Sequence, residues 1–207
     1  MPTETAVLDT FQAIETRRSV KHFDPDFVMP AEEERKLFEL AMLSPTSFNM
    51  QNWRFVNVKD KALREQIKAA SWGQSQVTDA SLLVVVCGDY NAYGRDTNRY
   101  WRNAPDEVKN YIVPMIGKFY DGNTQLQRDE ALRSGGIASQ TLMLAARAMG
   151  YDSCPMVGFD PVKVAELINL PSDHMIVMLL PIGKAQKPAN VRSGSIPFEE
   201  AVKIDRF

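Results

Sequence analysis

The 207-residue sequence has few side chains that could catalyse a reaction on their own. It contains two cysteines and two histidines, with no Cys or His pair at the spacing of a zinc site, so we expect no metal centre. Cys87 and Cys154 each lie in or beside an apolar run, so we expect two buried, reduced thiols rather than a disulfide or redox pair. His22 and His174 have no nucleophile beside them in the sequence, and we expect surface or capping histidines.

Motifs that bind nucleotides or carry a nucleophile are also missing. No G-x-G-x-x-G follows an expected strand, no G-x-x-x-x-G-K-[ST] occurs, and there is no G-x-S-x-G. Dinucleotide-binding Rossmann, P-loop and serine-hydrolase readings therefore lose their main support. If the chain catalyses a reaction, we expect a cofactor to supply the reactive atoms.

The charge and hydropathy patterns give no reason to expect nucleic acid or a membrane as a partner. The net charge is −2 and the pI is about 5.8. The longest apolar runs, Leu82–Cys87 and Met175–Ile182, are too short to span a bilayer. Residues 1–5 are polar and lack the features of a signal peptide, so we expect a cytoplasmic protein by default.

Helical and strand patterns alternate along the chain, which predicts one layered α/β or α+β domain over residues 1–207. The predicted helices are residues 7–18, 30–43, 105–120, 124–149 and 161–168, with a further helix that Asp60 caps and that carries Leu63, Ile67 and Ala70. The predicted strands are residues 54–58, 82–87, 154–157 and 175–182. Residues 91–104 have no clear period, and we expect an excursion outside the core.

The long helix over 124–149 carries an apolar stripe and two adjacent glycines. The stripe comprises Ile137, Thr141, Leu144, Ala145 and Ala148. Gly135 and Gly136 should each cost about 1 kcal/mol relative to Ala, which close contact with another helix or a ligand could offset; simple tolerance is the alternative. The tail over 184–207 is polar with spaced apolar residues, so we expect it to lie on another surface such as a second subunit.

Two polar segments follow the first two predicted helices. Arg17–Lys21 places three cations and a hydroxyl at a helix end, where the planar guanidinium groups suit phosphate oxygens. The alternative is a solvated basic helix end, which the helix dipole favours. Ser44–Trp53 supplies hydroxyls and amides that suit a polyol or a heterocycle edge, or it is an ordinary polar loop.

Two further segments contain glycine beside polar groups. Trp72–Gln76 holds two amides, with an ordinary helix end as the alternative. Pro155–Asp160 joins a strand to a helix, and Gly158 allows close backbone approach near a helix N-terminus. The alternative for this segment is a plain turn with an Asp cap.

Taken in order, these segments resemble a known family. R-R-S-V-K, then S-P-T-S-F-N-M-Q-N-W-R-F, then G-Y-D-S-C-P-M-V-G-F-D are similar to the three motifs of the FMN-dependent nitroreductase family. The resemblance runs from about Phe11 into the tail. Within the family it is to the small bacterial oxygen-insensitive NAD(P)H type.

The resemblance implies a fold, an assembly and a reaction. The fold is α+β, with a central mostly antiparallel sheet and a C-terminal extension that wraps a homodimer partner. Two FMN molecules lie in the dimer interface, and each is touched by both subunits. NAD(P)H donates hydride through flavin N5, and a nitroaromatic or quinone-type small molecule accepts it in ping-pong fashion.

The resemblance also implies which residues bind FMN. It implies no catalytic side chain, because the flavin supplies the chemistry. Residues that match the first FMN segment are Arg17, Arg18, Ser19 and Lys21. Residues that match the other subunit's segment are Pro45, Thr46, Ser47 and Asn49. Residues that match the segment over the ring are Pro155, Met156, Val157 and Gly158. Lys21 and Gly158 are expected to tune the ring, and Arg192 is the tail's candidate phosphate ligand.

The sequence departs from the family motifs at two positions, and the resemblance also suggests which residues face the electron acceptor. Gln76 stands where some relatives carry Lys, and Val157 where some carry Glu, which alters the electrostatics around the flavin. The residues expected on the acceptor side are Phe48, Trp101, Phe119 and Tyr120. Two alternatives remain open: a related flavin enzyme for dehydrogenation, dehalogenation or flavin destruction, and a non-catalytic flavin-binding protein.

Overall fold

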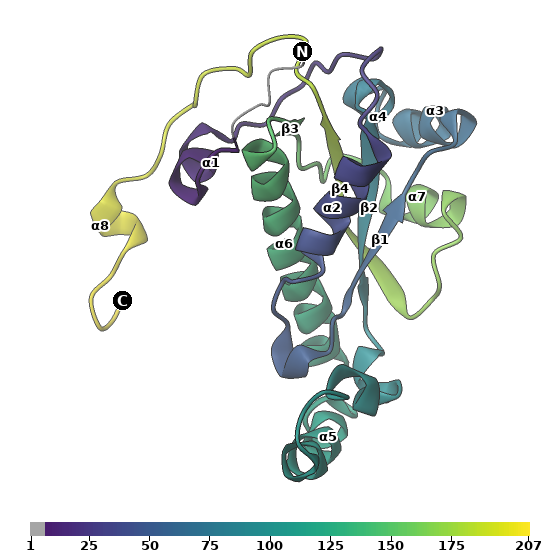
Figure 1. The fold of residues 1–207 in the computed structure, drawn as a ribbon, viewed down its shortest axis with the longest axis vertical. Helices are drawn as coiled ribbons and strands as arrows, with labels where there is room; N and C mark the ends of the chain where they lie inside the picture. Colours follow the sequence, from purple (N-terminus) through teal and green to yellow (C-terminus); the bar gives the residue numbers. More distant parts are fainter. Residues whose placement is uncertain (1–6) are drawn as a thin grey trace.

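Two long antiparallel strands, β2 and β4, form the centre of a four-stranded sheet (Figure 1). The computed structural model describes residues 7–207, so the polar residues 1–5 lie outside it. The strands are β1 (Trp53–Asn57), β2 (Leu82–Asp89), β3 (Asp152–Ser153) and β4 (His174–Gly183), in the order β1-β2-β4-β3. Every pairing is antiparallel, which confirms the expected α+β class.

Eight α-helices and three short 3-10 helices surround the sheet in the described part of the chain. The α-helices are α1 (Thr10–Thr16), α2 (Ala31–Ala41), α3 (Lys61–Ala70), α4 (Gln76–Asp79), α5 (Asp106–Tyr120), α6 (Thr124–Ala148), α7 (Pro161–Leu167) and α8 (Phe198–Ala201). The 3-10 helices are η1 (Ser47–Asn49), η2 (Ala92–Gly94) and η3 (Thr97–Tyr100). Within residues 7–207, no helix combines the length and apolar character needed to span a bilayer.

Strand β2 is buried along its whole length because its side chains alternate between two apolar layers. Leu83 and Val85 belong to the layer that includes residues of α3 and α7. Val84 and Val86 belong to the layer that includes residues of α2 and α6. The continuous apolar run therefore reads correctly as a strand covered on both faces.

Helix α6 packs on the sheet through small residues, which lets the two backbones approach closely. A Cβ atom built at Gly135 would lie 2.5 Å from Val177 Cγ2 on β4. A Cβ atom built at Gly88 on β2 would lie 2.9 Å from the Cβ atom of Ala131 on α6. A Cβ atom built at Gly136 would have no atom within 4 Å among those compared. Close contact thus explains Gly135, and simple tolerance explains Gly136.

The apolar stripe predicted on α6 does not face the sheet. The five residues of that stripe instead line an open groove of about 560 Å³ that α6 forms with residues of α1 and α2. The stripe misleads because the buried side of α6 consists largely of small and polar residues, with Leu142 and Met143 as its only large apolar members.

Several predicted boundaries are wrong by one turn or less. The first helix is Thr10–Thr16 rather than 7–18, since Asp9 accepts from the Gln12 N–H and begins it with a capping box. The second helix is Ala31–Ala41 rather than 30–43, with Pro30 at the N-cap. The first strand is shifted by one residue, and Asp60 caps α3 as expected.

The strand predicted over 154–157 is wrong. The regular strand is Asp152–Ser153, two residues earlier than predicted. Pro155 has no N–H to donate and interrupts the ladder, although Met156 and Leu179 of β4 still exchange both backbone hydrogen bonds, at 2.8 and 3.0 Å. The backbone is then free to turn toward Gly158.

Residues 91–104 are not outside a core, contrary to expectation. They fold as η2 and η3, and Ala92 and Tyr100 are buried in a small apolar cluster with Ile116 and Tyr120 of α5. Aromatic residues spaced along an irregular segment hide this cluster from a periodicity search. The lower end of the molecule in Figure 1 therefore has its own packing centre.

The two cysteines are free and buried, as expected. Burial raises the pKa of the Cys87 thiol to about 12, so this side chain stays protonated in the core. Cys154 lies beside the segment that leads to Gly158. Neither thiol is exposed.

The two adjacent glycines of α6 provide a matched stability test. We expect Gly135→Ala to destabilise the protein by about 1–3 kcal/mol, because its methyl group would clash with Val177. We expect Gly136→Ala to stabilise it by about 0.5–1 kcal/mol through helix propensity. Urea denaturation of both variants measures the difference, and equal effects would contradict the packing described here.

Candidate functional site

The cationic segment after α1 is held as an extended strand against β3. Ser19 and Ser153 form an isolated parallel bridge, and the Val20 N–H donates to the Ser153 carbonyl at 3.1 Å. This pairing brings Lys21 to the segment that continues from β3, where its Nζ donates to Cys154 Sγ at 3.3 Å. The first and third predicted cofactor segments are therefore neighbours within one chain.

The chain's tail brings a third guanidinium group to this place. Arg192 Nη2 donates to the carbonyls of Glu15 and Arg17 at 3.0 and 3.2 Å. Arg18 Nη2 donates to the Asn190 carbonyl. Residues 190–192 are thus fixed beside the end of α1, and Arg192 lies next to Arg17 and Arg18.

The Arg17 guanidinium has a buried N–H group without a partner, which an anion could satisfy. Its Nη1 is buried and has no hydrogen-bond partner within residues 7–207, and the buried Ser153 Oγ is likewise unpaired there. Burial, together with the nearby charges of Arg192 and Arg18, lowers the pKa of the Arg17 guanidinium. A buried donor without a partner is unfavourable by about 1–3 kcal/mol, so an oxyanion at this cluster would be stabilising.

The segment around Gly158 packs against the loop after α3. A Cβ atom at Gly158 would lie 2.9 Å from the ring of Trp72, so glycine is required here for this packing. Gln74 Nε2 donates to the Gly158 carbonyl at 2.8 Å, and Gln76 Nε2 donates to Gln74 Oε1 at 3.0 Å. Neither the Val157 nor the Gly158 N–H donates a hydrogen bond within the described residues, so both are free for a ligand.

Trp72 begins the segment Trp72–Gln76, which the sequence analysis singled out for its amides and not for this ring. It has a φ of +55°, which is unusual for a tryptophan, and 73% of its surface is exposed. The structure places this ring in a strained backbone conformation against Gly158, beside the third predicted cofactor segment.

The second predicted segment, Pro45–Asn49, lies at the start of α6. The buried carboxylate of Glu130 accepts from the Ser47 N–H at 3.2 Å and from Ser134 Oγ at 2.9 Å, and it also pairs with Arg133. Phe48 and Asn49 have positive φ values of 50° and 53°. Glu130, which the sequence reading missed, therefore holds a strained loop in place.

Phe48 projects from this loop into the aromatic group that was expected to line the acceptor side. Its ring centroid lies 5.6 Å from that of Phe119 and 6.2 Å from that of Tyr120. Trp101 Nε1 donates to the Phe48 carbonyl at 3.0 Å. Phe119 is exposed, whereas Tyr120 is buried and supports the other two rings from behind.

The two halves of the expected cofactor site do not meet within one chain. Thr16, just before the cationic segment, accepts a hydrogen bond from Arg147, while Ser47 donates to Glu130. Glu130 and Arg147 are separated by 17 residues of α6, which is about 26 Å along the helix axis. Moreover, the Gly158 segment packs in the sheet layer opposite α6.

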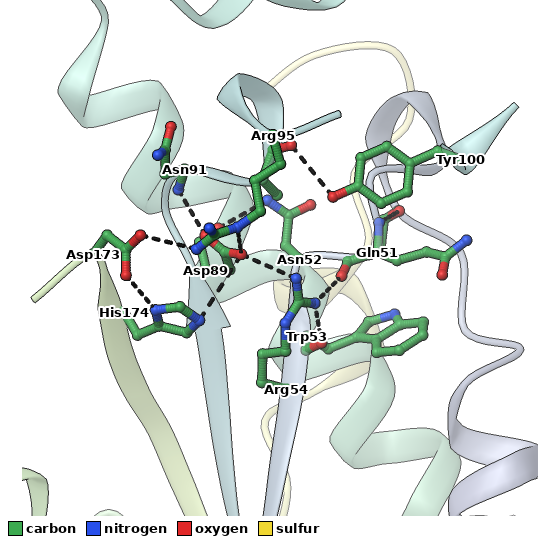
Figure 2. Close-up of polar contacts among 12 residues, drawn as sticks. Gln51, Asn52, Trp53, Arg54, Asp89, Asn91, Arg95, Tyr100, Asp173 and His174 are labelled. Atoms are coloured by element: carbon green, nitrogen blue, oxygen red, sulfur yellow. Dashed lines mark hydrogen bonds and ion pairs between the residues drawn. The ribbon is translucent and has the colours of Figure 1, made fainter. Parts of the chain in front are cut away.

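A buried charge cluster lies where β2 ends and β4 begins (Figure 2). Asp89 Oδ2 accepts from Arg54 Nη2 at 3.0 Å and from Arg95 Nε at 2.8 Å, and it lies 3.8 Å from His174 Nε2. Arg95 Nη2 also donates to Asp173 at 2.8 Å, and His174 Nδ1 donates to Asp173 at 2.6 Å. The cluster therefore ties the segment before η3 to the central sheet.

The sequence predicted a surface or capping histidine at position 174. The His174 side chain is only 11% exposed, so it is not a surface histidine. Within the described residues, Asp89, Asp173 and His174 are the one group that could converge on a metal ion. Arg54 and Arg95 already neutralise the two carboxylates, which makes an additional cation unfavourable. The cluster is therefore best described as a structural network.

The hydrogen bond from His174, with the charge of Arg95 nearby, lowers the pKa of the Asp173 carboxyl. The stabilisation from this group is therefore fully present above the ordinary carboxyl pKa of 3.8, and it is lost as the pH falls through the lowered value. The sequence signal for the cluster was an acidic residue ending one apolar run and an Asp-His pair opening the next.

Comparisons with known proteins agree with the fold. Residues 14–184 match the nitroreductase family. The chain is 58% identical to Protein DrgA of Synechocystis, over 91% of this chain and 90% of that protein. It is 34% identical to an oxygen-insensitive NADPH nitroreductase of Helicobacter pylori, over 88% of this chain and 90% of that protein.

A crystal structure from Exiguobacterium sibiricum that contains FMN has a similar fold. Its TM-score against this chain is 0.88 with 31% sequence identity, and the alignment covers 98% of this chain and all of that one. The likeness spans the sheet and the flanking helices.

The charge cluster gives a stability prediction. We expect Arg95→Ala to destabilise the protein by about 1–3 kcal/mol. This loss is smaller than that for removing the sole partner of a buried carboxylate, because Arg54 still pairs with Asp89. Arg128→Ala is the matched control, since Arg128 lies 3.8 Å from an Asp129 carboxylate that is itself exposed. Urea denaturation at neutral pH compares the two, and equal losses would show that the cluster adds no stability.

Proposed function

The chain belongs to the nitroreductase family, and on that basis we propose that it is an FMN-dependent NAD(P)H oxidoreductase that reduces nitroaromatic or quinone-type acceptors. The observation that carries the proposal is the buried, unpaired Arg17 Nη1 beside Arg18 and Arg192. No carboxylate forms a salt bridge with these three arginines within residues 7–207. A phosphate monoester such as that of FMN fits this donor set.

The remaining groups of the site suit a flavin beyond its phosphate. Arg17, Arg18, Ser19 and Arg192 would hold the phosphate, and Lys21 would place a positive charge near the ring. The free N–H groups of Val157 and Gly158 would donate to ring acceptors, and Gln76 would steady that segment through Gln74. When bound, FMN supplies two-electron hydride chemistry.

Because one open flavin face would serve both reactants, we propose that donor and acceptor use the same cleft in turn, with ping-pong kinetics. Trp72, Phe48 and Phe119 carry exposed or half-exposed rings that could bind flat aromatic or quinoid acceptors. Trp101 and Tyr120 would hold those rings in place. The use of NAD(P)H also suits a cytoplasmic enzyme.

We further propose that the active form is a homodimer with FMN at its interface. The separation of the two cofactor segments along α6 supports this, since Pro45–Asn49 could then complete the site of a second copy. The groove lined by α1, α2 and α6 would be the contact surface. The tail beyond β4 extends away from the body in Figure 1, with Ile196 and Phe198 exposed as if to lie on a partner.

The cofactor assignment gives a direct test. Purified protein is expected to be yellow and to oxidise NAD(P)H with a nitroaromatic acceptor. Arg17→Ala with Arg18→Ala is expected to weaken FMN binding by about 100-fold, through two lost charge-assisted contacts. Arg35→Ala, at an exposed ion pair on α2, is the control.

Measured FMN dissociation constants decide the outcome. Protein that is colourless and gains no flavin on reconstitution would rule out the proposed function. Unchanged affinity in the double variant would rule out this phosphate site.

The dimer assignment gives a second test. Leu43 is 79% exposed on the groove, so Leu43→Glu is expected to leave the single chain folded but to bury a charge in the dimer. We expect it to yield monomers that have lost FMN, as measured by light scattering and flavin absorbance. Val28→Glu, at an equally exposed position outside the groove, should remain dimeric. A monomeric Leu43→Glu protein that retains tight FMN binding would contradict the shared site.

A further inference from the structure

A cavity of about 470 Å³ lies between the loop containing η1 and the segment after η3. Its lining includes two guanidinium groups, three amides and an indole ring: Arg99, Arg102, Asn49, Gln51, Asn103 and Trp101. No carboxylate lines it. In a chain with a net charge of −2, a cavity of this composition is a local region of positive charge, which favours an anion.

The two arginines of the cavity are not engaged elsewhere. Within residues 7–207 neither Arg99 nor Arg102 forms a salt bridge, whereas Arg95, four residues before Arg99, pairs with both Asp89 and Asp173. The Arg99 guanidinium lies 4.9 Å from the centroid of the Tyr100 ring, which orients it without neutralising it. Both groups therefore keep their full donor capacity.

The cavity is firmly connected to the loop proposed to touch the flavin. Asn49 Nδ2 donates to the Tyr100 carbonyl at 2.7 Å, and Trp101 Nε1 donates to the Phe48 carbonyl at 3.0 Å. These bonds fix the floor of the cavity relative to Pro45–Asn49. An anion bound there would therefore lie close to the loop proposed to touch the flavin.

We propose that this cavity binds a phosphate group of the dinucleotide donor, an inference that rests on the proposed function. The planar forks of Arg99 and Arg102 suit phosphate oxygens, and the three amides suit the ribose hydroxyls beside them. NADH and NADPH share a pyrophosphate, and NADPH alone has a further phosphate on the 2′-oxygen of its adenosine ribose. Which of these phosphates is bound decides whether the site discriminates between the two donors.

The kinetic test replaces both arginines in the flavin-loaded protein. Arg99→Ala with Arg102→Ala is expected to raise the KM for the donor by about 10-fold or more, with kcat changed by less than about 2-fold. A rise for NADPH alone identifies the ribose phosphate, and a rise for both donors identifies the pyrophosphate. Arg35→Ala with Arg128→Ala carries the same charge change outside the cavity and should leave both KM values unchanged.

A binding test keeps the inference separate from turnover. Calorimetric titration with adenosine 2′,5′-bisphosphate and with ADP should show binding of at least one to the unaltered protein, and about 10-fold weaker binding to the double variant. This titration needs no electron transfer, so it measures ligand affinity for the cavity even if the proposed reaction is wrong. Unchanged donor KM values, together with unchanged titrations, would overturn the inference.

One further result would also overturn it. If the double variant raises the KM only for an anionic acceptor such as 4-nitrobenzoate, and not for neutral nitrobenzene or for either donor, the cavity binds acceptors instead. Flavin content measured in the same samples shows that any effect is not due to cofactor loss.

Discussion

The length and rigidity of α6 control where every other part of the candidate site can lie. The cationic segment is attached near its C-terminal end through Thr16, and the polar loop is attached near its N-terminal end through Glu130. Close packing of Gly135 on Val177 fixes the helix to the sheet. Because these attachments are about 26 Å apart along the helix axis, the two clusters that match one cofactor in the family are held near opposite ends of α6 in a single chain.

Each half of the site is built but incomplete. At one end, Arg17 is buried with an unpaired donor, and Lys21, Val157 and Gly158 present further donors to the same side. At the other end, Glu130 holds Phe48 and Asn49 in a strained backbone conformation that the isolated loop would not favour. A phosphate and a second copy of the chain would together satisfy the first half and use the second. The apolar groove on α1, α2 and α6 lies between the two attachments.

The sequence was sufficient to predict what depends on local pattern. The apolar runs, the Asp60 cap and the proline-started helix over 161–168 are specified within a few residues, and the structure has them. It was insufficient where contacts join distant residues. The Asp89 cluster draws on three separate segments, and the outward face of α6 depends on which side packs on the sheet. Trp72 and Glu130 appeared ordinary in sequence because their partners lie far along the chain.

A subunit-complementation measurement tests the central claim most directly. One chain carries Arg17→Ala with Arg18→Ala, and the other carries Thr46→Asp, which keeps an oxygen for the Gln51 N–H but adds a negative charge. Neither chain alone should bind FMN tightly. If each site draws on two chains, the purified mixed dimer has one site with both segments intact and should bind one FMN per dimer. If the mixed dimer binds none, both segments act within one chain and the account is wrong.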